Sequence, residues 1–311
     1  MKLTYATRRS ALALAQCRAF VARLKAAHPE LEMIEEQVVT TGDKIQDRPL
    51  SEVGGKGLFV KEIEEALLER RAHLAVHSIK DVPGLLPPGL FIACIPTRED
   101  PRDVLVSPKH GGLHALPQGA RVGTSSLRRA VSLRASRPDL DIVPMRGNVD
   151  TRLRKVDEGE CDAIVLARAG LVRLGLEHRA TEVLEPEISL PAVGQGALGI
   201  ECRIDDPSTI ALLAPLHDEA TSRCVAAERG VMVALEGDCK TPLGAYGERR
   251  VLSSPTGGVV ELHLRAFICD PDGKNLRRAE KSVAWPASDD DARIVGEALG
   301  AKLRTAAPSA P

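Results

Sequence analysis

The sequence predicts an α/β protein with two α/β domains around a cleft and a small C-terminal α+β domain. Strand-like and helical segments alternate in two series along the first two thirds of the chain. Pro-containing segments at 95–101 and 189–199 bracket the second series, and the composition changes near residue 216. A chain of 311 residues, 43% of them hydrophobic, is long enough for several cores. We expect domain 1 over residues 1–96 and 197–215, domain 2 over 97–196 and domain 3 over 216–311, with a hinge at the two crossings.

Each α/β series alternates short apolar runs with amphipathic segments, which is typical of strands joined by helices. In the first series we expect strands at 3–7, 34–41 and 74–79 and helices at 10–27 and 58–71. In the second we expect strands at 103–107, 121–124, 141–145 and 162–167 and helices at 127–136 and 150–158.

The C-terminal part has a different pattern. A helix is expected at 220–235, followed by two alternating segments at 258–268 and 276–285 and a final helix at 289–304. The turn Asp-Pro-Asp-Gly lies between the two alternating segments, and such a turn predicts a β-hairpin.

Composition restricts the function. The formal net charge is -1 and the pI is about 6.7, so the bulk charge attracts neither nucleic acid nor membrane. No segment is long and apolar enough to span a membrane, and the start of the chain lacks the pattern of a signal peptide. Seven cysteines without a CxxC pair fit neither a disulfide framework nor a zinc site. We therefore expect a cytoplasmic protein with reduced thiols and no metal. We also expect a monomer that binds neither nucleic acid nor membrane.

Positive charge is nevertheless concentrated locally in the second series. Eight arginines lie within 34 residues: Arg121, Arg128, Arg129, Arg134, Arg137, Arg146, Arg152 and Arg154. Arg128 and Arg129 fall in the first turn of a predicted helix that Thr124 and Ser126 precede, where free backbone N–H groups already favour an anion. Basic side chains oppose helix stability at this end, so their presence points to function.

The same construction recurs near the N-terminus, where Arg8 and Arg9 follow a strand and Ser10 is placed to cap a helix. Arginine binds carboxylates or phosphates in bidentate geometry, so we expect a ligand with several such groups, held between two anion sites that face each other. A solvated arginine surface and a reader of duplex phosphates are the alternatives. No aromatic residue occurs from 92 to 245, so base stacking has no platform there.

Three loops deserve comparison with known motifs. Lys80 and Asp81 follow an apolar strand, where α/β domains present catalytic groups, although a turn residue before Pro83 is an equally good reading. The segment GGKGLF at 54–59 lacks the order of a P-loop, and we expect a mobile lid. The segment GQGALG at 194–199 precedes a strand rather than a helix, so it is not a dinucleotide site.

Cys239 lies in a polar turn, LEGDCKTPLG, unlike the other cysteines. Lys240 beside it could favour the thiolate, so a reactive role and an inert buried thiol are both open from chemistry alone.

Nine segments occur in an order and spacing that resemble the porphobilinogen deaminase family. They are ATRRSALALAQ, GGKGLFVKEIE, AVHSIKDVP, EDPRD, GTSSLRR, RGNVDTRL, DAIVLARAGL, LPAVGQGALGIECR and LEGDC. The resemblance implies two domains like those of type-II periplasmic binding proteins and a transferase, hydroxymethylbilane synthase, that joins four porphobilinogen molecules head to tail with loss of ammonia and then releases the product by hydrolysis for haem and tetrapyrrole biosynthesis.

The resemblance also implies site residues. Cys239 would carry a covalent dipyrromethane cofactor, and Asp81 would stabilise positive pyrrole nitrogens. Positions that match cofactor-binding residues of the family are Lys80, Asp81, Thr124, Ser126, Arg128 and Arg129. Positions that match substrate-binding residues are Arg8, Ser10, Arg146, Arg152 and Arg173. Asp238 and Lys240 depart from the family pattern around the cysteine.

Two other classes of protein share this expected architecture: a binding protein for small dicarboxylates and the effector domain of a transcription regulator. The first is normally exported and the second needs a DNA-binding unit, for which the sequence offers no room. Both leave Cys239 and the two basic corners unexplained.

Overall fold

A computed structural model of the chain describes residues 1–44, 60–237, 241–253 and 258–307. The chain forms two compact units, which are described separately. Unit 1 comprises Met1–Glu99 and Ala197–Ser222, and unit 2 comprises Asp100–Gly196 and Arg223–Pro311.

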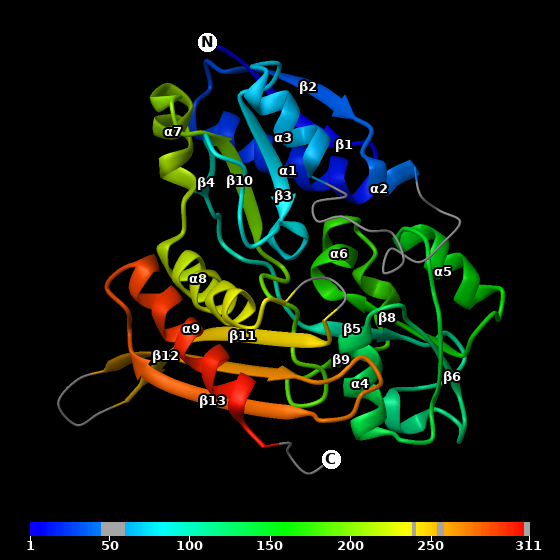
Figure 1. Ribbon diagram of the computed structural model, residues 1–311. Helices are drawn as coiled ribbons and strands as arrows, with labels where there is room; N and C mark the ends of the chain where they lie inside the picture. Colours follow the sequence, from blue (N-terminus) through cyan, green and yellow to red (C-terminus); the bar gives the residue numbers. More distant parts are fainter. Residues whose placement is uncertain (45–59, 238–240, 254–257, 308–311) are drawn as a thin grey trace. The chain divides into compact units, whose positions relative to one another are not determined.

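Unit 1 is built on a five-stranded sheet with the order β2-β1-β3-β10-β4 (Figure 1). Its strands are β1 (Lys2–Arg8), β2 (Glu32–Val38), β3 (Leu74–Ser78), β4 (Leu90–Cys94) and β10 (Leu198–Arg203). Its helices are α1 (Ala11–Ala27), α2 (Thr41–Lys44), α3 (Lys61–Leu68), α7 (Pro207–Leu213) and the short 3₁₀ turns η1 (Ile79–Asp81) and η4 (Ala214–Leu216). β1 runs parallel to β2 and β3, whereas β10 runs antiparallel to both of its neighbours.

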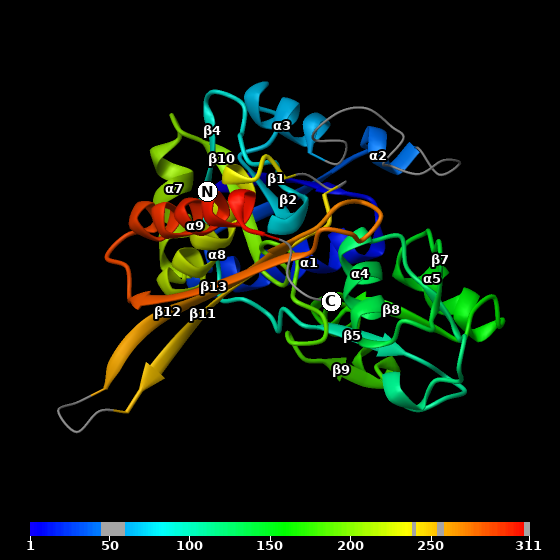
Figure 2. The same ribbon diagram turned by 60° about the horizontal axis from the view of Figure 1, so that its bottom comes forward.

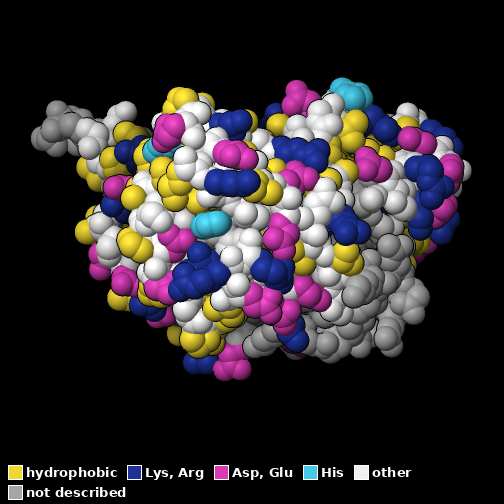
Figure 3. All heavy atoms as spheres, turned by 90° about the horizontal axis from the view of Figure 1, so that it is seen from above, with side chains coloured by type: hydrophobic (Ala, Val, Ile, Leu, Met, Phe, Trp, Pro, Cys, Tyr) yellow, Lys and Arg dark blue, Asp and Glu magenta, His cyan; other side chains and the backbone are white. Residues whose placement is uncertain are grey.

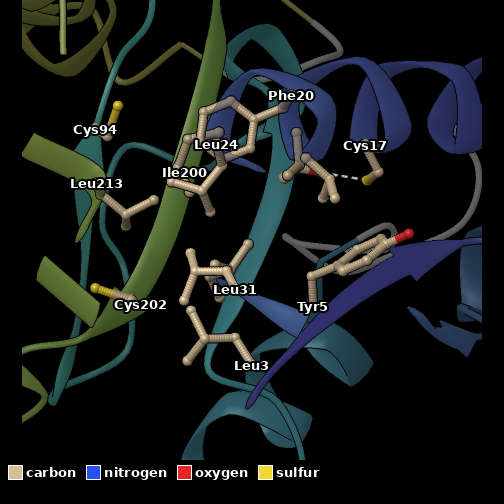
Figure 4. Close-up of a cluster of buried hydrophobic side chains, with 13 residues drawn as sticks. Leu3, Tyr5, Cys17, Phe20, Leu24, Leu31, Cys94, Ile200, Cys202 and Leu213 are labelled. Atoms are coloured by element: carbon tan, nitrogen blue, oxygen red, sulfur yellow. Dashed lines mark hydrogen bonds between the residues drawn. The ribbon is translucent and has the colours of Figure 1, made fainter. Parts of the chain in front are cut away.

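Alternation along the strands gives this sheet two apolar faces. Leu3 and Tyr5 of β1 pack with Phe20 and Leu24 of α1 on one face (Figure 4). Ala6 of β1 belongs to the opposite face, in the cluster that α3 covers. Successive side chains of a strand point to opposite faces, so one short strand serves both cores.

Unit 2 contains a second five-stranded sheet with the order β7-β6-β8-β5-β9. Its strands are β5 (Asp103–Val106), β6 (Arg121–Gly123), β7 (Asp141–Val143), β8 (Ala163–Ala167) and β9 (Glu182–Leu184). Its helices are α4 (Leu127–Ser136), α5 (Val149–Asp157), α6 (Arg168–Arg173) and the 3₁₀ turns η2 (Leu113–Ala115) and η3 (Glu177–Arg179). Here β5 is the antiparallel strand, so the two sheets share one spatial arrangement of strands although the sequence shows no repeat. They differ in chain order, since β5 is the first strand of its sheet and β10 is the last of its own.

The C-terminal part of unit 2 is an antiparallel three-stranded sheet covered by two helices (Figure 2). The elements are α8 (Glu219–Ala234), β11 (Leu243–Leu252), β12 (Val259–Ile268), β13 (Arg277–Ala284) and α9 (Asp289–Thr305). Val231 of α8 and Leu299 of α9 share a core with Leu262 and Leu264 of β12.

The structure confirms the expected α/β class, with two α/β sheets and a smaller α+β part. The helices at 10–27 and 127–136 lie where the sequence places them, and the predicted hairpin is the pair β12–β13. The helix expected at 58–71 is described only as α3, and Arg70 ends it with a positive φ of 60°. β4, β9 and β11 were not expected. The predicted domain boundaries stay a prediction, and the expected lid at 54–59 lies outside the described residues.

Within the described part of the chain, no helix is long and apolar enough to cross a membrane.

Candidate active site

Unit 1 presents charged side chains at the ends of two neighbouring strands. Because β1 and β3 are parallel, their carboxyl ends lie at the same edge of the sheet, where α/β proteins bind ligands. Arg8 ends β1, and the turn η1 after β3 carries Lys80, which is exposed, and Asp81, which is half-buried. Arg8, Ser10 and Asp81 line one pocket.

The polar residues around this pocket are held by local hydrogen bonds. Ser10 caps α1, since its side chain accepts a hydrogen bond of 3.3 Å from the backbone N–H of Ala13. Gln16 of α1 and Ser78 of β3 also line the pocket and exchange hydrogen bonds of 3.1 and 3.2 Å. A carboxylate and a guanidinium in one supported pocket can bind a ligand with both positive and negative groups.

In unit 2, the first turn of α4 holds the two predicted arginines. Ser126 caps this helix by accepting from the N–H of Arg129 at 3.4 Å, and the Thr124 hydroxyl accepts from the N–H of Ser126 at 3.1 Å. Both arginine side chains turn inward and are less than a tenth exposed. Their common partner is Asp103, which is fully buried at the start of β5.

Asp103 accepts hydrogen bonds on both oxygens. Arg128 Nη1 donates to Oδ2 at 2.8 Å, and Arg129 Nη2 donates to Oδ1 at 2.7 Å. The Ser189 hydroxyl and Gln195 Nε2 each donate at 2.8 Å. Burial alone would raise the pKa of Asp103, but the two guanidinium charges outweigh it and hold the pKa far below its usual range. One carboxylate thus neutralises one of the two arginine charges.

The remaining charge belongs to a cationic cluster of Arg129, Arg146 and Arg152. Burial, followed by repulsion from Arg129 and Arg146, lowers the pKa of Arg152 to about 10. Arg152 Nε donates to the Gly147 carbonyl at 2.8 Å, whereas Arg146 Nη1 is buried without a hydrogen-bond partner. Cations that repel one another and leave a buried donor unmatched are suited to an anionic ligand.

The structure therefore brings the predicted residues together in two groups. Arg8, Ser10 and Asp81 share the pocket of unit 1, with Lys80 next to Asp81. In unit 2, Arg129 is grouped with Arg146 and Arg152, and Thr124 and Ser126 form the helix start.

Two predicted residues have their guanidinium groups engaged by the protein itself, and a third is not described. Arg128 is engaged by Asp103 and by the carbonyl of Leu190 at 2.6 Å. Arg173 donates to the Gly196 carbonyl at 2.6 Å. Cys239 lies outside the described residues. The ligand contacts of all the site residues stay predictions.

Sequence reasoning missed Asp103 as the partner of the two arginines. A signal was present, because a charged residue opens the apolar run Asp103–Val106 and a buried charge needs a partner. No group of three His, Cys, Asp or Glu side chains in the described ranges could hold a metal ion.

Comparison with known proteins identifies the family. A family model described as "Porphobilinogen deaminase, dipyromethane cofactor binding domain" matches residues 3–211, and one described as "Porphobilinogen deaminase, C-terminal domain" matches residues 222–305. The chain is 61% identical over 303 residues to the porphobilinogen deaminase of Sorangium cellulosum, covering 97% of this chain and 98% of that protein. It is 56% identical over 301 residues to the porphobilinogen deaminase of Syntrophotalea carbinolica, covering 97% of this chain and 90% of that protein.

Among solved structures, similarity extends to the probable amino-acid ABC transporter extracellular-binding protein ytmK of Bacillus subtilis. The TM-score is 0.43 at 9% identity, covering 70% of this chain and 90% of that chain. The two family models together span nearly the whole sequence, and the identity to both named relatives is far above that of unrelated proteins of one fold. The chain therefore belongs to the porphobilinogen deaminase family.

Proposed function

We propose that the protein joins four porphobilinogen molecules head to tail with loss of ammonia, on a dipyrromethane cofactor bound covalently to Cys239, and releases hydroxymethylbilane by hydrolysis. The observation that carries this proposal is the Asp81 pocket at the strand ends of unit 1, in a chain 61% identical to a porphobilinogen deaminase. A dicarboxylate-binding protein or a regulator effector domain is not favoured by these relatives.

The described residues fit a cofactor and a substrate that both carry carboxylates, with Arg129 at a predicted cofactor-binding position and Arg146 and Arg152 at predicted substrate-binding positions. Arg129, Arg146 and Arg152 form a repelling cluster in which a buried guanidinium nitrogen lacks a partner, and a carboxylate would satisfy both conditions. Thr124 and Ser126 at the start of α4 would add hydroxyl groups, and Lys80 would add a further cation. When bound, dipyrromethane supplies the pyrrole carbon to which the first substrate unit is joined.

Asp81 has the electrostatic role. Each substrate loses its aminomethyl nitrogen as ammonia, so positive charge develops on the pyrrole ring. A fixed carboxylate in a partly enclosed pocket stabilises that charge, and it can accept the proton that the new carbon–carbon bond releases. Arg8 and Ser10, in the same pocket, would hold the acetate or propionate group of the substrate. The cytoplasmic location and the monomeric state stay predictions.

The direct test is the intact mass of the purified protein and of its Cys239→Ser variant. We expect the wild-type mass to exceed the polypeptide mass by two linked pyrrole units and the variant to have the bare mass. A bare wild-type protein would be incubated with porphobilinogen and weighed again. No gain of mass would contradict the proposed cofactor, and equal gain in the variant would contradict Cys239 as its anchor.

The role of Asp81 predicts the behaviour of Asp81→Asn. This variant keeps the shape of the side chain but removes its charge, so we expect turnover to fall by at least about 100-fold. The thermal unfolding midpoint should stay close to that of the wild type, because Asp81 is only half-buried. Product formation from porphobilinogen is the measurement. Near-normal turnover in Asp81→Asn would remove Asp81 from the mechanism.

A further inference from the structure

Three titratable side chains are buried in unit 1, and one of them, His77, lines the pocket described above. Glu64 of α3 is 8% exposed, His77 of β3 is 5% exposed and Glu201 of β10 is 1% exposed. In the antiparallel register, Glu201 lies opposite Ala75 and His77 lies opposite Gly199, so the two polar side chains share one face of the sheet. The surrounding layer is apolar and includes Ile63, Leu67 and Ala75.

The hydrogen bonds of these three residues are incomplete. His77 Nε2 and Glu201 Oε2 form a hydrogen bond of 2.9 Å, in which the imidazole N–H donates when Glu201 is ionised. Glu201 Oε1 and Glu64 Oε1 are both buried without a hydrogen-bond partner. An unmatched oxygen of a buried carboxyl group costs free energy, because burial removes the water that would otherwise hydrogen-bond to it.

The surroundings of Glu64 favour its protonated form. Burial is the main reason that the pKa of Glu64 is raised to about 7, and the negative charge of Glu201 is the second. His77 lowers this pKa and Glu65 raises it slightly further. Arg8 on β1 and Asp81 on η1 line the same pocket as His77. Arg203 on β10 is committed to the Leu67 and Ala72 carbonyls and to Asp206.

This cluster is continuous with the Asp81 pocket. His77 lines that pocket directly, together with Ile63, the residue before Glu64. Charges in a partly buried site interact more strongly than charges in water, so gain or loss of one proton in this wall changes the field in the pocket.

We propose that Glu64, His77 and Glu201 form one proton-holding unit that sets the charge of the wall facing Asp81 and the substrate. The inference rests on the proposed function. Whatever the charge of the imidazole, loss of the Glu64 proton adds one negative charge to this wall. That charge favours the substrate ammonium and the cation that develops from it, so the unit acts as a positioning device for charge and does not react.

The first experiment measures the unit without the reaction. A carboxyl whose pKa is raised on folding stabilises the native state at low pH, and this contribution is lost as pH rises from the unfolded value, about 4.3, through the folded value. Because glutamine does not titrate, Glu64→Gln does not lose stability in this way as pH rises. We therefore expect the unfolding midpoint of Glu64→Gln, relative to the wild type, to increase from pH 5 to pH 8. Glu69→Gln, at an exposed position at the end of the same helix, is the matched control and should follow the wild type.

A difference between Glu64→Gln and the wild type that is the same at pH 5 and pH 8 would overturn the proposal. If the glutamine variant does not fold, Glu64→Met serves in its place, because an apolar side chain of similar length removes the same proton from an apolar layer.

The second experiment links the unit to the pocket. Glu64→Gln mimics the protonated state, so kcat/KM for porphobilinogen should match the wild type at pH 6 and fall about three- to tenfold below it at pH 8. Parallel pH profiles for the two proteins would overturn the link to Asp81. A wild-type protein without any turnover would instead overturn the proposed function, and the unfolding experiment alone would then decide whether the proton is held at Glu64.

Discussion

Asp103 organises the arginine corner of unit 2 at the level of single residues. Its two oxygens receive Arg128 and Arg129, and the hydroxyl of Ser189 and the amide of Gln195 complete the set. Arg128 is thereby fixed inside the protein, and Arg129 is held in place as part of the cationic cluster. Of the two adjacent arginines, Arg128 thus has a structural role, and Arg129 contributes to the positive charge of the cluster.

Replacement of this carboxylate tests that interpretation. Asp103→Asn would leave two buried guanidinium groups without a counter-charge, so we expect a loss of about 3–5 kcal/mol of unfolding free energy at pH 7. Denaturant unfolding is the measurement. Asp157→Asn is the control, since Asp157 pairs with Arg179 at the surface and should change stability by less than about 1 kcal/mol.

The destabilisation caused by Asp103→Asn should depend on pH. Because folding lowers the pKa of Asp103, its stabilising contribution is present above the unfolded pKa of about 3.9 and is lost as pH falls below it. The difference between wild type and Asp103→Asn should therefore narrow below pH 4. A difference that does not depend on pH would mean that the ion pairs do not stabilise the fold.

Two arginines on α5 provide a matched pair of variants for testing the cationic cluster of Arg129, Arg146 and Arg152. Arg152 belongs to the repelling group, whereas Arg154 is exposed and pairs with Glu158 at 2.7 Å. Arg152→Gln should raise KM for porphobilinogen by about 10- to 100-fold, as expected for one charged hydrogen bond. Arg154→Gln should leave KM unchanged. Steady-state kinetics of both variants decide whether the cluster or the general positive charge of α5 binds substrate.

At the scale of elements, α8 and α9 approach so closely that only glycine fits between them. A Cβ atom on Gly296 would lie far inside van der Waals contact with the Ala227 carbonyl oxygen and 3.1 Å from Cα of Gly230. These contacts are with backbone, which cannot turn aside as a side chain can. The two glycines therefore set the distance between the helices that cover the three-stranded sheet.

This contact reverses the usual preference for alanine in a helix. Gly296→Ala should lower the free energy of unfolding by about 1–3 kcal/mol through overpacking, although alanine normally stabilises a helix relative to glycine. Ala301→Gly, at an exposed position of α9, is the control and should cost about 1 kcal/mol from propensity alone. A stabilised Gly296→Ala would show that the two helices can separate without cost.

Helices and strands whose ends are marked by nearby residues were predictable from the sequence. Strands that form only because a distant segment pairs with them were not. The caps Ser10 and Ser126 act within one turn of chain, so α1 and α4 were placed correctly. β11 contains Gly244 and Gly247 and carries no strong strand signal, and its ten residues become a strand because they pair with β12. Distance along the chain also concealed the partnership of Asp103 and Arg128, which are 25 residues apart.

At the scale of the whole molecule, positive and negative charges nearly balance, so attraction of an anionic substrate depends on local groups of arginines. The formal net charge is -1, and on the face shown in Figure 3 basic and acidic side chains are interspersed. Attraction of a carboxylate-bearing substrate must therefore come from a few arginines, over distances comparable to the Debye length of about 8–10 Å near physiological salt.

Added salt should act on binding more than on chemistry. Between 0.05 and 0.5 M NaCl we expect KM to rise about two- to fivefold while kcat changes little, because screening weakens the encounter but not a partly buried carboxylate. Sucrose of equal viscosity is the control for diffusion. A kcat that falls as steeply as KM rises would place the salt-sensitive charges in the chemical step.

The late position of β10 in the chain affects the order in which the two five-stranded sheets can form during synthesis. β10 lies between β3 and β4, yet about a hundred residues separate it from β4, so the first sheet to emerge from the ribosome lacks its inner strand. The sheet of unit 2 has all five of its strands once residue 184 has been made. The nascent chain therefore completes the strands of its second sheet before those of its first, and the edges of β3 and β4 that β10 pairs with stay open until residue 203 has been made.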